Sequence, residues 1–152
     1  MQLTRQKKLV AGVSLIEVLV SIVVLSVGLL GIAGLQLTSL RFLYDANLVY
    51  QATIQASDMA DRIRANPIGR DNGHYNNISG TGSDPGCIDT NCNPAQLAAT
   101  DRFEWNTANA RLLPNGAGVV SANGNQFTIT LTWREMTPLG PNNRNFRLVV
   151  YL

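Results

Sequence analysis

The fold of this chain is decided by residues 12–37, which read GVSLIEVLVSIVVLSVGLLGIAGLQL. Glu17 is the only charged residue in this run, and the part from Val18 to Leu35 has no charge and only two hydroxyl side chains. Such a stretch is long enough to cross a bilayer core of about 30 Å as a helix. A carboxylate near the end of a membrane helix costs several kcal/mol unless a partner pairs with it. Glu17 therefore indicates a partner rather than a contribution to stability.

The charges before this run predict its orientation. Arg5, Lys7 and Lys8 precede it, and no acidic residue lies before Glu17. Positive charge beside a membrane helix keeps that side in the cytoplasm. We therefore expect the residues after the helix on the far side of the membrane.

Length and composition limit the remaining functions. A chain of 152 residues with a net charge of +2 provides one domain besides the apolar run. Without residues 1–12, nine Lys and Arg stand against ten Asp and Glu, a net charge of −1, so no direct nucleic-acid site is evident. The sequence has no paired carboxylates in a glycine-framed pocket, no Ser–His arrangement and no cofactor loop. We expect no enzyme activity, no catalytic residue and no cofactor.

Three other interpretations of the apolar run compete with a membrane helix whose carboxylate pairs with another molecule. A secretory signal peptide would be cleaved near Gly31-Ile32-Ala33, but Glu17 lies within its apolar region and the helical pattern continues beyond that site. A simple membrane anchor leaves Glu17 unexplained. A buried core helix is disfavoured, because the run of 25 residues is too long for so small a domain.

The helical pattern continues past Leu37 and becomes amphipathic. Apolar residues recur at three- and four-residue steps, with polar residues between them. The apolar set is Leu40, Leu43, Tyr44, Leu48, Ala52, Ala56, Met59, Ala60 and Ile63, and the polar set is Gln51, Gln55, Asp58, Asp61, Arg62 and Arg64. Pro67 ends the pattern, because the residue before a proline disfavours helix. One helix from about Val13 to about Ala65 is predicted, and its second half needs a covering layer.

Three glycines, Gly28, Gly31 and Gly34, recur at three-residue steps in the apolar run. Small residues let helices approach closely in an apolar medium, although each glycine weakens a helix by up to about 1 kcal/mol relative to alanine. A specific packing role and ordinary membrane-helix glycine are equal alternatives.

Residues 66–93 predict a loop-rich connection, because they hold five glycines, six asparagines and two prolines with little periodicity. His74, the only histidine, has no second ligand at metal spacing, so we expect a solvated residue and no metal site. Asn77-Ile78-Ser79 fits a glycosylation sequon, a triplet that also arises by chance. Cys87 and Cys92 cannot complete a zinc site and lack the C-x-x-C spacing of redox enzymes. A local disulfide between them is predicted, in an oxidising compartment.

The next segment predicts a short helix. Asn93-Pro94 supplies a cap followed by proline at the first helical position. Apolar spacing then predicts a helix from Pro94 to Ala110, with Trp105 as its core anchor. Leu113-Pro114-Asn115-Gly116 is a turn signal.

The C-terminal part predicts strands. Residues 119–122 meet a hairpin turn at Asn123-Gly124, residues 126–136 alternate regularly, and Pro138-Leu139-Gly140-Pro141 turns the chain again. Residues 146–152 alternate in a last strand. Phe127, Ile129, Leu131 and Trp133 are predicted to face one way, and Thr128, Thr130 and Thr132 the other. An antiparallel meander of three or four strands is expected, with one face covered by the amphipathic half of the long helix. The predicted fold class is α+β.

The N-terminal residues resemble those of type IV pilin precursors. Gly12-Val13-Ser14-Leu15-Ile16-Glu17 is similar to the class III signal of that family, usually Gly-Phe-Ser/Thr-Leu-Ile/Leu-Glu, with Val13 in place of phenylalanine. More narrowly, several segments resemble the PilV group of minor pilins: residues 17–20, 28–36, 98–101 with Trp105, 113–116 and the threonine-rich strand ending in Trp133.

This resemblance implies a processing and assembly pathway. A membrane prepilin peptidase would cut between Gly12 and Val13 and methylate the new amine of Val13. Glu17 would then meet the positively charged N-terminus of a neighbouring subunit. Such a charge pair in an apolar bundle selects one axial offset between helices.

The resemblance also implies an organisation and a location. Residues 1–12 would be a leader, residues 13–37 the membrane-spanning and assembly half of the helix, and residues 38–152 a periplasmic head with the type IV pilin fold. The chain would lie in the inner membrane with a cytoplasmic N-terminus and become extracellular in a pilus. Expected partners are the prepilin peptidase, other minor pilins, the major pilin and a candidate tip adhesin. A minor pilin that primes assembly near the tip is the main interpretation, and a type II secretion pseudopilin is the alternative.

Overall fold

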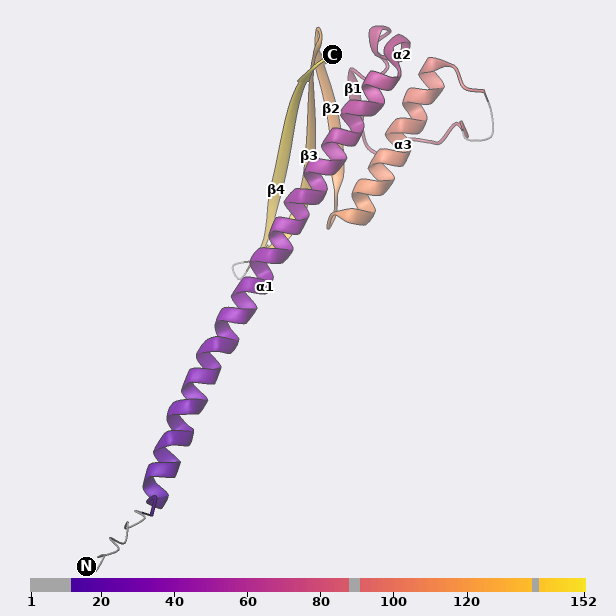
Figure 1. Cartoon of the computed structure of the whole chain (residues 1–152). Helices are drawn as coiled ribbons and strands as arrows, with labels where there is room; N and C mark the ends of the chain where they lie inside the picture. Colours follow the sequence, from indigo (N-terminus) through magenta and orange to yellow (C-terminus); the bar gives the residue numbers. More distant parts are fainter. Residues whose placement is uncertain (1–11, 88–90, 138–139) are drawn as a thin grey trace, which may run out of the picture. The chain divides into compact units, whose positions relative to one another are not determined.

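The computed structural model describes residues 12–87, 91–137 and 140–152. Along the chain, the elements are α1 (Leu15–Ala65), α2 (Pro67–Asp71), β1 (Asn77–Ser79), α3 (Pro94–Leu112), β2 (Ala117–Asn123), β3 (Gln126–Thr137) and β4 (Gly140–Tyr151), as labelled in Figure 1. The chain divides into two compact units, of which the first ends at Phe42 and the second is Leu43–Leu152. Helix α1 contributes residues to both.

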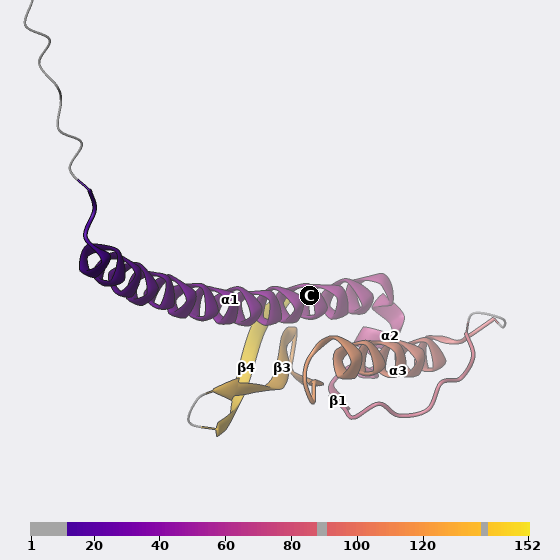
Figure 2. The same ribbon diagram turned by 90° about the horizontal axis from the view of Figure 1, so that it is seen from below.

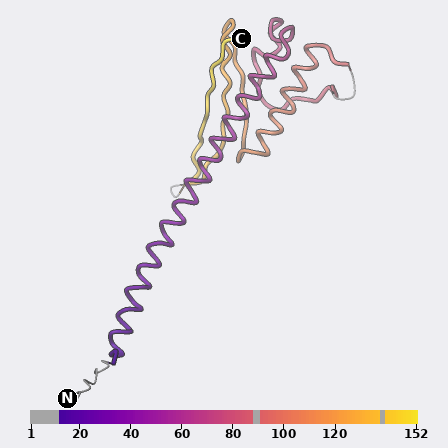
Figure 3. Tube along the Cα trace, viewed as in Figure 1, coloured from indigo at the N-terminus to yellow at the C-terminus, as the bar shows by residue number. Residues whose placement is uncertain are grey.

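The second unit contains a four-stranded antiparallel sheet in the order β1-β2-β3-β4. Strands β2, β3 and β4 follow one another as a meander, which the chain trace in Figure 3 shows. The register pairs Val120 with Ile129 and Ile129 with Leu148, so these apolar side chains share one face. The predicted core face of β3 is confirmed: Phe127, Ile129, Leu131 and Trp133 are at most 4% exposed.

The second half of α1 and helix α3 cover this apolar face, and the two helices run side by side (Figure 2). From α1, the side chains Leu48, Ala52, Ala56, Met59, Ala60 and Ile63 are buried. From α3, the fully buried Trp105 donates a hydrogen bond from its indole N–H to the backbone oxygen of Gln55 (2.8 Å). The ring lies so close to β2 that a Cβ on Gly118 would be 2.3 Å from it, so glycine is required there. This is a type IV pilin-like α+β fold, as predicted.

The predicted covering stripe of α1 is longer than the observed one. Leu43 and Tyr44 are 64% and 56% exposed, and burial in α1 begins at Leu48. Gln55, predicted among the polar positions, is instead buried in the interface with α3. Periodicity cannot distinguish these cases, because it does not show where the sheet ends or which neighbour faces a polar side chain.

The predicted loop region 66–93 contains two short elements, which corrects the sequence interpretation. Helix α2 is capped by Asn66, whose side-chain oxygen accepts a hydrogen bond from the backbone N–H of Gly69 (3.0 Å). Strand β1 pairs with β2 and places Ile78 opposite Val120. Three residues are too short for a visible alternation, and the partner strand lies far along the chain, so β1 leaves no local pattern.

Several boundaries also differ from the predictions. Helix α1 begins at Leu15 and helix α3 ends at Leu112. The β2–β3 hairpin pairs Asn123 with Gln126, so the turn residues are Gly124 and Asn125 rather than Asn123 and Gly124. Gly124 has a φ of 57°, a conformation that favours glycine and is required at the first position of a type II′ turn.

Gly140 and Pro141, predicted as part of a turn, belong to β4. Strand β4 lies at the end of the strand order, and proline is tolerated on an edge strand where its missing N–H is not needed for pairing. The other two residues of the predicted turn, 138 and 139, lie outside the described residues.

Candidate functional site

The predicted cleavage site lies in a non-helical, exposed segment. Residues 12–14 precede α1 and are exposed. The backbone oxygen of Ser14 accepts the N–H of Glu17 (3.1 Å), which starts the helical hydrogen-bond ladder. The peptide bond between Gly12 and Val13 is therefore outside the helix, in the kind of exposed segment where proteolysis is favoured. The basic residues of the predicted leader lie outside the described residues.

The apolar side chains of the first unit have no cover within the described chain. Every large hydrophobic side chain from Val13 to Leu37 is between 44% and 85% exposed. By length and composition, α1 contains a segment that can cross a membrane. So much continuous apolar surface is not stable in water, so this helix needs lipid or other helices around it.

Glu17 is placed in the first turn of α1. Its carboxylate makes no hydrogen bond or ion pair with any residue in the described part of the chain. The hydroxyl of Ser21 donates to the backbone oxygen of Glu17 (2.7 Å) and leaves the carboxylate free to act elsewhere. The partial positive charge of the helix N-terminus favours this carboxylate, but by only about 0.3–1 kcal/mol. The side chain therefore still calls for an external cation once it is in an apolar medium.

Residues 7–33 match the family model of the prokaryotic N-terminal methylation motif. The match includes Gly12, Val13 and Glu17. It supports a type IV pilin or pseudopilin that is a substrate of a prepilin peptidase, and proteins of these two classes are structural. Together with the exposed apolar helix, this prepilin motif fits membrane anchoring before assembly. No curated protein and no solved structure matches the chain.

Apart from the prepilin motif, a charged cluster joins α1 to α3 in the second unit. The guanidinium of Arg62 contacts Asp58 (2.9 Å) on its own helix and Asp101 (3.0 Å) and Glu104 (2.7 Å) on α3. Burial by itself lowers the pKa of Arg62, but hydrogen bonds to Glu104, Asp58 and Asp101 outweigh burial, so its pKa is raised above the ordinary value. Arg62 is therefore a permanent cation that holds three carboxylates together.

Asp101 extends this cluster into the core. Its second carboxylate oxygen accepts the hydroxyl of the fully buried Tyr75 (2.5 Å). Burial, and then this hydrogen bond, raise the pKa of Tyr75 well above its ordinary value. The side-chain amide of Asn66 donates to the Tyr75 oxygen (3.1 Å) and to the backbone oxygen of Pro94 (2.8 Å). The network ties the end of α1 to the start of α3.

Sequence reasoning did not assign a role to this network. Asp101 lies four residues before Trp105, the predicted core anchor, and this helical spacing places it on the inward side of α3. An acidic residue at a core-facing position is the signal that could have indicated a buried ion pair. Its partner Arg62, however, is 39 residues away in sequence, and no spacing rule connects the two.

Cys87 and Cys92 form a disulfide with a Cα–Cα distance of 5.4 Å, in agreement with the sequence prediction. His74 is exposed. Among the residues that the structure describes, no group of three or more His, Cys, Asp or Glu side chains could hold a metal ion.

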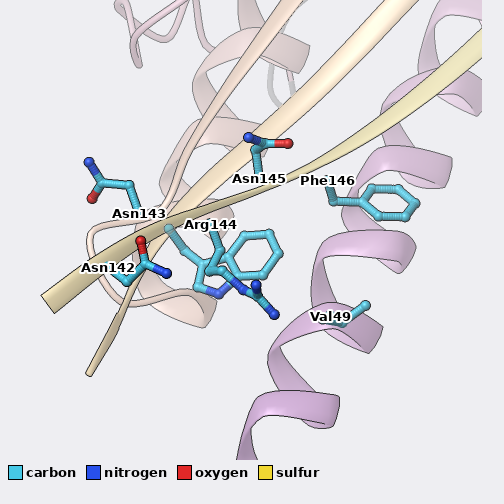
Figure 4. Close-up of a pocket in the computed structure, with 7 residues that line it drawn as sticks. Val49, Asn142, Asn143, Arg144, Asn145 and Phe146 are labelled. Carbon is cyan, nitrogen blue, oxygen red and sulfur yellow. The ribbon is translucent and has the colours of Figure 1, made fainter. Parts of the chain in front are cut away.

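A polar hollow of about 390 Å³ lies between α1 and the first half of β4, and the sequence did not predict it. It is lined by Val49, Trp133 and residues 142–146. Figure 4 shows Phe146 pointing toward α1, on which Val49 lies at another turn, with three asparagines and Arg144 along the strand. Arg144 forms an ion pair with Glu135 (3.1 Å) and is still 52% exposed.

Proposed function

We propose that this chain is a minor pilin, similar to the PilV group, that takes part in initiating type IV pilus assembly and is incorporated at or near the pilus tip. The observation that carries the proposal is the Glu17 carboxylate. It lies without a partner among the described residues, in an exposed apolar helix that begins three residues after Gly12, inside the prepilin motif. A charge in that position is costly in the membrane and useful only where an oppositely charged group meets it.

Under this proposal, the prepilin peptidase removes residues 1–12 and methylates the new amine of Val13. Residues 13–37 then hold the chain in the inner membrane, and residues 38–152 form a periplasmic head that becomes extracellular in the pilus. Mass spectrometry of fibre-associated protein should find methylated Val13 as the first residue. A mature terminus at Gly34 would instead support an ordinary signal peptide and contradict the proposal.

Cleavage creates the cation that Glu17 lacks. The amine of Val13 is positively charged, and in the assembling fibre Glu17 of one subunit pairs with the amine of its neighbour. Removal of one member of a buried ion pair leaves an uncompensated charge and costs about 3–5 kcal/mol, so wrong axial offsets are strongly disfavoured. The neighbours are other minor pilins and the major pilin, with a tip adhesin as a further candidate.

The test is Glu17→Gln in the full-length protein, because this change keeps the size of the side chain and removes its charge. The variant should be cleaved, accumulate in the inner membrane, associate poorly with partner minor pilins and reduce surface piliation. Ser21→Ala is the matched control, since Ser21 is exposed one turn later on the same helix. Normal piliation and partner association for Glu17→Gln at wild-type protein levels would show that the charge is not the docking element.

A pseudopilin of a type II secretion system is the second candidate, because the prepilin motif is common to both classes. The PilV-like segments of the head favour the pilus. Deletion of the chain separates the two: loss of pili with intact protein secretion supports the minor pilin, and loss of secretion with intact pili supports the pseudopilin.

A further inference from the structure

Strand β4 presents a long, open edge. It is 12 residues long and is the last strand in the sheet order, so in the described chain it pairs on one side only, with β3. The register with β3 is unbroken from Thr137–Gly140 to Gln126–Tyr151. A sheet edge of this length exposes a row of backbone donors and acceptors to which another strand can bind.

The phase of the hydrogen-bond ladder shows which residues face outward. The backbone N–H of Leu152 donates to the oxygen of Asn125 (3.0 Å), and in antiparallel pairs bonded and outward-facing residues alternate. The odd-numbered residues of β4 therefore direct their N–H and C=O groups to the open edge. They are Asn143, Asn145, Arg147, Val149 and Tyr151, while Pro141 can only accept.

The open edge is basic. Strand β4 carries Arg144 and Arg147 and no acidic residue, and the adjacent strand adds Arg134. The acid next to them, Glu135, is already paired with Arg144, and its side chain is only 11% exposed. Arg147 lies opposite Thr130 on the uncovered face, whereas Arg144 lies opposite Trp133 on the helix-covered face.

This charge pattern disfavours a second copy of the chain as the occupant. An antiparallel pair of two β4 strands centred on Arg147 would place Arg147 of each copy opposite Arg147 of the other, and a pair centred on Arg144 would do the same for Arg144. Like charges directly opposite each other destabilise a strand pair. Other registers offer the arginines no carboxylate, because β4 has none. The arginines thus protect the edge from self-association and favour an acidic partner.

We propose that the edge of β4 binds an extended segment of another protein by strand addition, and that this segment carries acidic residues at positions i and i+3. A residue opposite Arg147 lies on the uncovered face, and a residue three positions away lies on the other face, opposite Arg144. The second carboxylate would sit at the mouth of the polar hollow. An apolar residue two positions from the first acid, on the other side, would contact Val149, which is 45% exposed. The inference concerns the second unit alone and does not rest on the proposed assembly role.

Synthetic peptides test this proposal on the full-length protein in detergent. A fluorescent ten-residue peptide of alternating threonine and valine, with glutamate at i and i+3, should bind in an anisotropy titration. The same peptide with glutamine at both positions should bind at least tenfold more weakly. N-methylation of the alternate residues that face β4 should abolish binding, and N-methylation of the other alternate set should preserve it. Equal affinity for the glutamate and glutamine peptides would overturn the proposal.

Charge reversal on the protein provides the matched arm. The Arg147→Glu variant should bind the glutamate peptide with at least tenfold lower affinity than the wild type. It should instead bind a peptide with lysine at position i. Arg111→Glu, on the exposed end of α3, is the control and should bind like the wild type. Hydrogen exchange should show new protection at the outward-facing residues of β4. The inference would be refuted if both variants lost peptide affinity equally, or if protection from hydrogen exchange were confined to other elements. It would also be refuted by a dimer that forms without peptide and is protected from exchange along β4.

Discussion

Replacement of Asp101 by alanine should lower the free energy of unfolding of the second unit by about 2–4 kcal/mol. The change removes two hydrogen bonds of the carboxylate, from Arg62 (3.0 Å) and from Tyr75 (2.5 Å). Hydrogen bonds that involve a charged group contribute about 1.5–3 kcal/mol each. The two bonds sum to about 3–6 kcal/mol. The expected loss lies around and below the lower end of that range, because Arg62 is 28% exposed and keeps Asp58 and Glu104 as partners.

Urea unfolding of the full-length protein in detergent measures this loss, with fluorescence of Trp105 and Trp133 as the signal. Both tryptophans are buried in the second unit, so they report on its unfolding. Asp61→Ala is the control: Asp61 also pairs with an arginine, Arg64, but is 73% exposed, so a loss of less than about 0.5 kcal/mol is expected. Similar losses for the two variants, or less than about 1 kcal/mol for Asp101→Ala, would refute a structural role for the buried network.

Two further predictions concern the second unit. Alkylation should label neither Cys87 nor Cys92 until a reductant is added, and reduction should cost at most about 2 kcal/mol because the disulfide closes a short loop; free thiols without reductant would reject the bond. The raised pKa of Tyr75 means that its stabilising contribution is complete below the ordinary tyrosine pKa of about 10 and is lost as pH rises through the folded-state value. Stability should therefore fall at alkaline pH, and Tyr75→Phe should make this fall shallower in urea titrations; an unchanged slope would contradict the assignment.

Local patterns were sufficient for several elements. The N-cap of α3 was predicted from Asn93-Pro94 and is confirmed: the Asn93 side chain accepts a hydrogen bond from the Gln96 N–H (2.9 Å), as part of a capping box that was not predicted. The alternation of β3 predicted its buried face residue by residue. The turn at residues 113–116 is present, with Asn115 at a positive φ of 51°. All three signals depend on neighbours within a few residues, which is why they can be recognised without the fold.

Other features depend on residues that are far apart in the chain. Strand β1 forms because Ile78 pairs with Val120 on β2, and the sequence of its three residues does not by itself predict a strand. The buried position of Gln55 depends on the indole of Trp105, 50 residues later. The inward orientation of Asp101 is predictable from spacing, but its compensation by Arg62 is not.

The sequence by itself determined the exposed apolar helix, its single carboxylate, the segment before it and the α+β class, because hydrophobic periods and charge positions act locally. Only the tertiary structure decided that one arginine gathers three carboxylates at the α1–α3 contact and that β4 leaves a basic edge open. Such features arise when side chains from distant segments enter one low-dielectric space, or when strand order leaves one backbone unpaired. The spacing of residues along the chain predicts neither condition.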